Sequence, residues 1–272
     1  MTPTTTAATG RHDPATIPPG PGPATTPPDP APATTTDRPD PSTGRAAGYD
    51  ASVIVVVGQP VLRFVAGEPV AAGPAARIAI AAAARGSTVQ LIGKVGEDPD
   101  GDALVLALAR SGVGHVALLR DPSRPTPRMV EPETDAPLDE ARGAEPGPIT
   151  IEPADSERRP TLDAGDVDLG LRYLTEFTVL VVTETRDDAQ TDAMTAAAGW
   201  TGATIIVLVQ DGLDAPLRLP DEAIVLQAPP PDPDGPFDVL VGDLAAAIDR
   251  GIPPQIAFRE IVAAEGWEPA SP

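Results

Sequence analysis

Apolar residues in this chain gather in short segments that alternate with alanine-rich or amphipathic ones. Predominantly apolar segments, several of them β-branched, predict buried strands at 51–58, 88–96, 178–185 and 203–210. The intervening stretches have helical composition, and three end in glycine, so we expect helices at 75–86, 101–112, 166–177 and 189–202. Strands that alternate with helices at short intervals predict an α/β fold, with a doubly wound, mostly parallel sheet flanked by helices.

Weaker patterns add further elements. We expect strands at 115–121, 148–154 and 223–228, a short one around "PRMVE", and helices near 238–250 and 254–266. His115 falls in the first of these strands, where a core or solvent role is expected rather than metal binding. Trp200 is expected to pack against the domain.

Composition divides the chain into three parts. Most of its threonine–proline–alanine bias falls in residues 1–48, which contain almost no large apolar side chains. Such a segment cannot bury enough surface to offset the entropy of ordering, so it is predicted to be a disordered tail. We expect one α/β domain at 49–267 and a short tail at 268–272.

Charge and cysteine content exclude several classes of partner. The formal net charge is −21, with 40 acidic and 19 basic residues, which disfavours binding to nucleic acid or to anionic membranes. The chain has no cysteine, so it has no thiolate nucleophile and no cysteine-based metal site, and no metal ligands are predicted elsewhere. The apolar segments are too short to span a membrane, which predicts a soluble, cytoplasmic protein.

Residues 71–130 carry the most specific pattern. Glycines, small residues and an aspartate recur there in a fixed order, with Thr126 following in "RDPSRPT"; they are Gly73, Pro74, Ala75, Ala76, Ala79, Gly86, Gly93, Gly96, Asp98 and Gly101. Over about sixty residues this segment resembles the ribokinase (PfkB) family of carbohydrate kinases. Glycines permit tight turns between strands and helices, and Asp98 or Asp102 can cap a helix.

The segment "DPDGPFD", residues 232–238, resembles the second signature of that family. The resemblance implies ATP-dependent phosphoryl transfer to a sugar hydroxyl, with Mg²⁺ carried by the nucleotide. Asp238 stands at the position of the general base, and the turn of Gly235, Pro236 and Phe237 at that of the anion hole.

Several positions depart from the family pattern. Pro236 has no N–H to donate, and Phe237 adds bulk where the phosphate should approach. Gly73 belongs to the part of the family pattern that binds the sugar. The residues that accept hydrogen bonds from the sugar in that family are replaced here by Arg63 and Arg77. A guanidinium group only donates hydrogen bonds, so these two arginines could instead suit an anionic sugar. The lid strands are reduced to residues 61–71, and the segment before residue 232 is short and lacks the family's Asn-x-x-Glu motif.

These observations leave alternatives open. The chain is identified as a divergent, abbreviated member of the family, either a kinase with impaired catalysis or a non-catalytic pseudokinase that senses a sugar-like ligand or contacts a protein. A third reading is a structural partner protein that docks through its tail. The sequence is compatible with a monomer or a dimer.

Overall fold

The structure of the protein is a computed structural model that describes residues 52–130, 150–184, 187–209, 219–227 and 235–264. The chain divides into two units, Met1–Gly48 and Tyr49–Pro272, and every described residue belongs to the second. The predicted tails at 1–48 and 268–272 lie outside the described residues.

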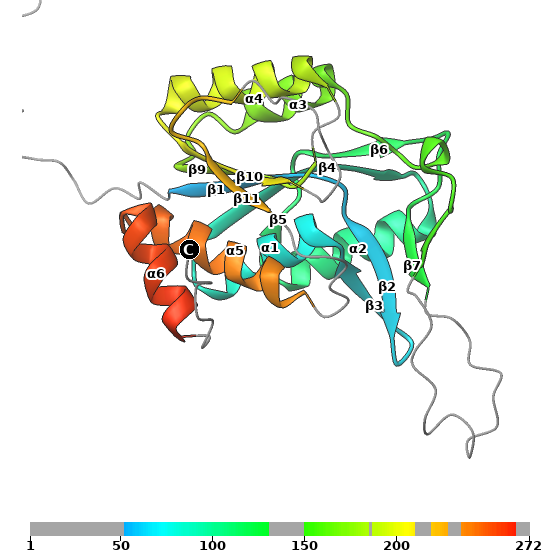
Figure 1. Cartoon of the computed structure of the whole chain (residues 1–272). Helices are drawn as coiled ribbons and strands as arrows, with labels where there is room; N and C mark the ends of the chain where they lie inside the picture. Colours follow the sequence, from blue (N-terminus) through cyan, green and yellow to red (C-terminus); the bar gives the residue numbers. More distant parts are fainter. Residues whose placement is uncertain (1–51, 131–149, 185–186, 210–218, 228–234, 265–272) are drawn as a thin grey trace, which may run out of the picture. The chain divides into compact units, whose positions relative to one another are not determined.

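A parallel sheet forms the centre of the described unit (Figure 1). Its strands follow the order β11-β10-β9-β1-β4-β5, and β6 also pairs with β4. All these pairs are parallel, which confirms the predicted doubly wound sheet. The strands are β1 (Val53–Val57), β4 (Thr88–Gly96), β5 (Val113–Gly114), β6 (Leu118–Asp121), β9 (Val179–Val182), β10 (Thr204–Val209) and β11 (Ile224–Gln227).

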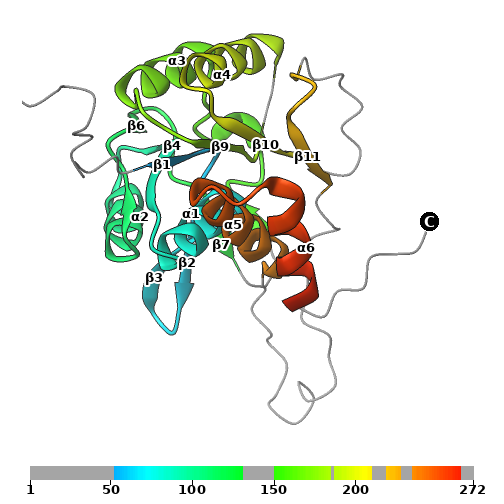
Figure 2. The same cartoon turned by 90° about the vertical axis from the view of Figure 1, so that its left-hand side faces the viewer.

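Helices cover both faces of this sheet, as Figures 1 and 2 show. One face carries α1 (Pro74–Ala84), α2 (Pro99–Arg110), α5 (Pro236–Asp249) and α6 (Pro254–Ala264), and the other carries α3 (Ala164–Tyr173) and α4 (Asp188–Thr201). The side chains of β1 alternate between the two layers: Ile54 and Val56 join the first hydrophobic cluster, and Val55 and Val57 the second. Both faces of the strand are therefore buried, which explains its uninterrupted apolar sequence.

A second sheet of four strands lies beside α2, in the order β3-β2-β7-β8. It contains β2 (Val61–Val65), β3 (Glu68–Ala72), β7 (Arg128–Val130) and β8 (Thr150–Glu152), and a short 3-10 helix follows at Ser156–Arg158. The sequence assigned only residues 61–71 to a reduced lid. The hairpin of β2 and β3 does form there, and β7 and β8 extend it from a distant part of the chain.

The start of α2 is held by one carboxylate, as the sequence predicted. Asp98 accepts hydrogen bonds from Gly101 N, and from both the backbone N and Oγ1 of Thr126. Burial alone would raise the pKa of Asp98, but these hydrogen bonds and the nearby charge of Arg120 outweigh it and hold the pKa below its ordinary value. Asp102 instead pairs with Arg120 at 2.7 Å.

Two expectations are corrected. His115 does not lie in a strand, because only residues 118–121 of the predicted segment 115–121 form a strand, β6, and His115 lies in the short connection between β5 and β6. Trp200 does not pack into the domain, since it lies at the end of α4 and is 89% exposed. Neither residue belongs to the hydrophobic core, which mostly aliphatic side chains fill.

Within the described ranges, none of the helices is long and apolar enough to cross a membrane. The same residues contain no group of three or more His, Asp or Glu side chains arranged to hold a metal ion.

Candidate functional site

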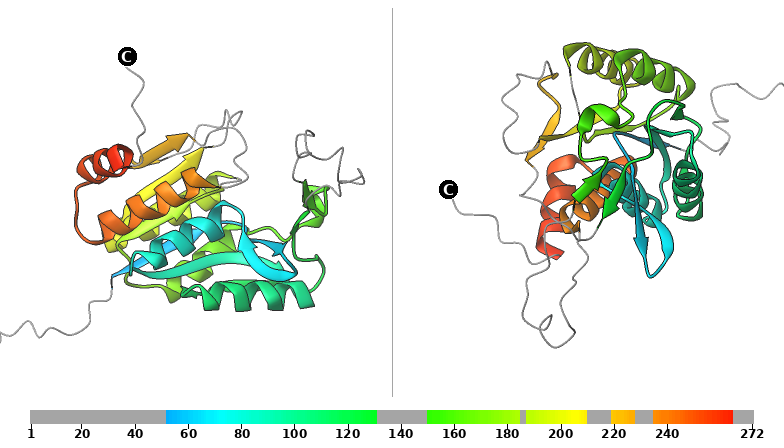
Figure 3. Two further views of the ribbon diagram at one scale, coloured as in Figure 1. Left: turned by 90° about the horizontal axis from the view of Figure 1, so that it is seen from below. Right: turned by 90° about the vertical axis from the view of Figure 1, so that its right-hand side faces the viewer.

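The carboxyl ends of the central strands bring four chain segments to one edge of the sheet. The chain leaves β1 at Gly58 and β9 at Thr183, and α1 and α5 both begin at this edge (Figure 3). Between β1 and β9 the strand order reverses, because the chain runs from β1 to β4 on one side and later returns to β9 on the other. In open α/β sheets such a reversal is where ligands bind.

The start of α5 contains the predicted base and anion hole. Gly235 precedes the helix in the left-handed conformation, with φ of 70° and ψ of 32°. Pro236 is the first residue of the helix and Asp238 the third, so the carboxylate belongs to the first turn, where its charge interacts favourably with the helix dipole. Asp238 is only 8% exposed.

Arg77 of α1 reaches this turn. Its Nη1 lies 3.6 Å from Oδ2 of Asp238, and both side chains are largely buried. The same guanidinium lies against Gly235: a Cβ atom added there would come within 2.6 Å of Arg77 Nη1 and 2.7 Å of Arg77 Cδ. A cation therefore occupies the space next to the predicted anion hole.

Two glycines allow the close approach of these segments. Gly73 precedes α1 with φ of 81°, a conformation that favours glycine, and its carbonyl accepts the backbone N–H of Arg77. At the end of β1, a Cβ added to Gly58 would lie 1.9 Å from Thr183 Oγ1 and 3.1 Å from Ala75 Cβ. The absence of a side chain at Gly58 thus lets β1, β9 and α1 converge.

The predicted substrate-binding residues are not all brought together. Gly73 and Arg77 share the first turn of α1. Arg63 instead lies in β2 of the second sheet, where its register partners are Val70 and Met129. A role for Arg63 in ligand binding stays a prediction.

The side chain of Phe237 does not lie where the sequence suggested. Its side chain is buried in the hydrophobic cluster of α1, α5 and the sheet, so it does not add bulk at the phosphate position. The second residue of α5 faces the core, and an aromatic side chain there anchors the helix start. Pro236 is the first residue of α5, and because a proline has no N–H it cannot donate at the predicted anion hole.

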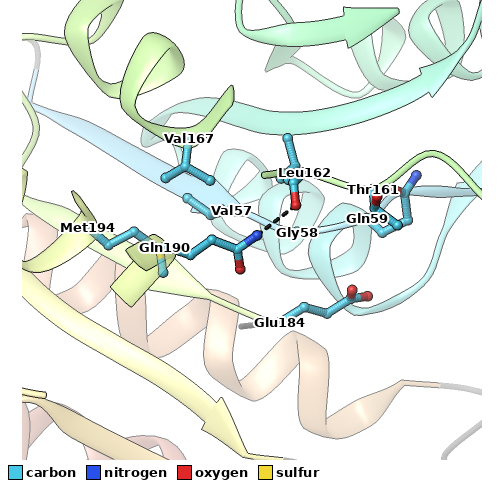
Figure 4. A pocket seen from close by; sticks show the side chains of 9 residues that line it. All are labelled: Val57, Gly58, Gln59, Thr161, Leu162, Val167, Glu184, Gln190 and Met194. Atoms are coloured by element: carbon cyan, nitrogen blue, oxygen red, sulfur yellow. Dashed lines mark hydrogen bonds between the residues drawn. The ribbon is translucent and has the colours of Figure 1, made fainter. Parts of the chain in front are cut away.

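A small cavity opens at the reversal point, on the side of α3 and α4 (Figure 4). It measures about 20 Å³, room for about one water molecule. Its polar lining includes Gln59, Thr161, Glu184 and Gln190, and Gln190 Nε2 donates to the carbonyl of Leu162 at 2.6 Å. These residues were not predicted from the sequence, although Gln59 directly follows a predicted strand and Glu184 lies near the end of another, positions where ligand-binding side chains are common.

No protein-family model and no curated protein sequence matches this chain. Solved structures do match it. The crystal structure of Sa239 aligns over 80% of this chain and 95% of its own, with a TM-score of 0.56 and 12% identity. A putative ribokinase II from E. coli, in its apo form, aligns over 77% and 90%, with a TM-score of 0.54 and 15% identity.

Ribokinase from Arabidopsis thaliana, solved with ribose and ATP, aligns over 79% of this chain and 91% of its own, with a TM-score of 0.52 and 16% identity. The chain has the ribokinase-like fold. The structural neighbours confirm the predicted relationship at the level of the fold, which sequence identities of 12–16% could not establish alone.

In this ribokinase-like protein the larger cavity is not at the predicted site. A cavity of about 240 Å³ lies at the opposite edge of the sheet, where α1 and α5 end, and its lining includes Arg85, Ser87, Asp249 and Arg250. Three of these side chains already have partners: Arg85 pairs with Asp243, and Ser87 donates a hydrogen bond to Asp249. The candidate site is therefore the carboxyl edge around Arg77 and Asp238.

The ribokinase-like scaffold supports that edge with a further ion pair. The ammonium group of Lys94, in β4, donates a hydrogen bond to the carboxylate of Asp166, in α3, at 2.7 Å. The backbone carbonyl of Lys94 accepts a hydrogen bond from Gln59 Nε2 at 2.6 Å. Asp166 also takes part in the capping box of α3 together with Asp163. These contacts fix the loop after β1 relative to β4 and α3.

Proposed function

We propose that this ribokinase-like protein has lost phosphoryl transfer and acts as a non-catalytic pseudokinase that binds a sugar-like ligand at the carboxyl edge of its sheet. The observation that carries the proposal is the contact of Arg77 with Asp238 at 3.6 Å.

The carboxylate of Asp238 is poorly placed to act as a general base. To take a proton from a sugar hydroxyl, a carboxylate must accept that hydroxyl at about 2.6 to 3.2 Å. The guanidinium of Arg77 lies beside the carboxylate of Asp238, and a guanidinium only donates and keeps its charge at any physiological pH. A neutral hydroxyl would have to compete with this cation for the carboxylate.

The start of α5 also offers little room for the transferred phosphate. A transferred phosphate needs backbone N–H donors at the helix start and open space in front of them. Pro236 removes one possible donor, and Arg77 fills the space next to Gly235. Phosphate could approach that side only if Arg77 moved.

The fit of ATP and Mg²⁺ depends on the same residues. Among structures with this fold, one putative ribokinase II from E. coli was solved with ATP and Mg²⁺, and the Arabidopsis ribokinase with ribose and ATP. In this chain the residues at the start of α5 fit the transferred phosphate poorly, because Arg77 occupies the space next to Gly235. We therefore assign no ATP-dependent step to the pseudokinase.

A second candidate, an ATP-dependent carbohydrate kinase, is favoured by one observation. Asp238 is retained as the third residue of α5, at the carboxyl edge of the sheet. In that case Asp238 would be the general base, and Mg²⁺ would enter with the nucleotide.

Two measurements separate the candidates. The first is ADP release from ATP and Mg²⁺ with a panel of neutral sugars and sugar phosphates, for wild type and Asp238→Asn. The pseudokinase predicts the same background rate for both proteins. Sugar-dependent release that disappears in Asp238→Asn would establish the kinase and end the proposal.

The second measurement is ligand binding, followed by thermal shift with the same sugars in the absence of nucleotide. We expect a sugar-dependent shift that Arg77→Asn abolishes. The matched control is Arg85→Asn, because Arg85 also joins α1 to α5, through Asp243 at 2.6 Å, but at the opposite edge of the sheet. If Arg85→Asn alters the sugar-dependent shift as much as Arg77→Asn does, the assignment of the site is wrong.

A further inference from the structure

The hairpin of β2 and β3 is joined at both ends to the carboxyl edge of the central sheet. β2 begins at Val61, three residues after Gly58, and β3 ends at Ala72, the residue before Gly73. The turn of the hairpin projects beyond the central sheet (Figures 1 and 2). The direction of the hairpin therefore determines what lies beside the candidate site at this edge.

The two halves of this hairpin differ in burial. Near the edge, Leu62 and its strand partner Ala71 are buried in the hydrophobic cluster that includes α1. Towards the turn, Phe64 and Val65 are both almost half exposed, and Val70 is 39% exposed. The core fixes the inner half of the hairpin, whereas burial contributes little to the position of the outer half.

An arginine joins the outer half of the hairpin to α2. Arg128, in β7, lies beside Leu62 in the register of the second sheet. Its guanidinium lies over the ring of Phe64, 5.4 Å from the ring centroid, and donates two hydrogen bonds to the carboxylate of Asp100, one of them at 2.6 Å. A guanidinium has a flat face and a fork of N–H donors, so one side chain can stack on a ring and bind a carboxylate at the same time.

Neighbouring residues align the two partners of this ion pair. Asp100 belongs to the first turn of α2, two positions after the cap residue Asp98, and Thr126, which binds Asp98, stands two positions before Arg128. The hydrogen bonds that Arg128 donates to Asp100 raise the pKa of the arginine above its ordinary value. A bidentate pair of arginine and carboxylate with both partners aligned is stronger than an ordinary surface ion pair.

We propose that Arg128 and Asp100 form a clamp that holds the outer half of the β2–β3 hairpin in one direction relative to α2. When the ion pair breaks, the outer half moves about the buried inner half. Because the two side chains are 47% and 23% exposed, salt weakens their attraction and can release the clamp. The proposal is independent of whether the carboxyl edge binds a sugar or catalyses a reaction.

A distance measurement tests the clamp, because the chain contains no cysteine and spin labels can be placed at will. One label is attached to Glu68→Cys, at the exposed start of β3, and the other to Asp192→Cys, on the exposed side of α4. With the clamp intact, double electron–electron resonance at low salt should give a single narrow distance distribution. Arg128→Gln and Asp100→Asn should each lose the narrow peak.

The matched control is Asp102→Asn. Asp102 also lies in the first turn of α2, but it pairs with Arg120 of β6, at 2.7 Å, and not with the second sheet. This variant should keep the narrow peak. Labels at Leu106→Cys in α2 and Asp192→Cys in α4 report on the rest of the domain, and their distance should be the same in every variant.

Two further measurements distinguish a clamp from a simple charge effect. Arg128→Lys keeps the positive charge but has neither the fork nor the flat face, so it should also lose the narrow peak. Raising the salt to about 1 M, where the screening length is about 3 Å, should broaden the distribution when the clamp residues are unchanged and have no effect on Arg128→Gln.

Four results would overturn the proposal. The distribution could be broad at low salt with both clamp residues present. Arg128→Gln and Asp100→Asn could keep the narrow peak. Asp102→Asn could broaden the distribution as much as Asp100→Asn does. Or the narrow peak could persist at 1 M salt or in Arg128→Lys, which would show that something other than this bidentate ion pair holds the hairpin.

Discussion

Gly242 lies in the middle of α5, at its contact with α1, and replacing it with alanine tests how tightly these helices pack. A Cβ atom at this position would lie 2.6 Å from Ala81 Cβ and 2.7 Å from the carbonyl oxygen of Ile78. Neither atom belongs to a flexible side chain, so relief requires α1 or α5 to move as a whole. The two helices run side by side (Figure 3), and residues on their facing sides belong to one buried hydrophobic cluster.

Two effects of opposite sign decide the outcome for Gly242→Ala. Alanine is favoured over glycine inside a helix by about 1 kcal/mol. Overpacking a tight core contact costs about 1 to 3 kcal/mol and sometimes more. Because both contacts lie well inside the normal separation, we expect the steric cost to exceed the helical gain, with a net destabilisation of about 1 to 2 kcal/mol.

The assay is urea denaturation of Gly242→Ala, compared with Gly199→Ala as the matched control. Gly199 also lies in a helix, α4, but a Cβ there would meet nothing within 4 Å, so the same change should stabilise the protein by up to about 1 kcal/mol. If Gly242→Ala is as stable as wild type or more so, the argument from close packing is refuted. An additional Ala81→Gly substitution should recover part of the loss.

Two further predictions concern stability. The lowered pKa of Asp98 means that its hydrogen bonds with Thr126 contribute stability above the unfolded pKa of about 4, and that this contribution is lost as pH falls through the folded pKa. Acid unfolding below about pH 4 should therefore be steeper for wild type than for Asp98→Asn, and parallel curves would contradict this. Leu104→Ala should cost about 2 to 5 kcal/mol in urea denaturation, because the side chain is fully buried between α2 and the sheet. A loss below about 1 kcal/mol would show that the site collapses around the smaller residue.

The parts of the fold that local pattern determines were predictable. Most strands of the central sheet are largely buried, and most of the helices are buried on one face, so hydrophobic segments and terminal glycines located most of these elements within a few residues. The cap at Asp98 was also predictable, because an aspartate before an apolar helix is a common start signal.

Other parts depend on contacts between distant segments, and no local pattern encodes them. The ion pair of Arg77 with Asp238 joins α1 to α5, and only the packing of these two helices brings it together. The burial of Phe237 depends on which side of α5 faces the sheet, a choice that the turn sequence alone does not fix. The strands β7 and β8 were both predicted, but the sequence did not indicate that they extend the sheet of β2 and β3.

The central position of β1 affects how the chain can fold during synthesis. β1 pairs with β4, which follows soon in sequence, and with β9, which emerges much later. The face of α1 that packs against α5 is likewise left uncovered until α5 has been synthesised. Until β9 and α5 leave the ribosome, a growing chain exposes one edge of β1 and the alanine-rich face of α1 to solvent. Because such distant pairings slow folding and leave apolar surface accessible, we expect the partly synthesised protein to depend on chaperones.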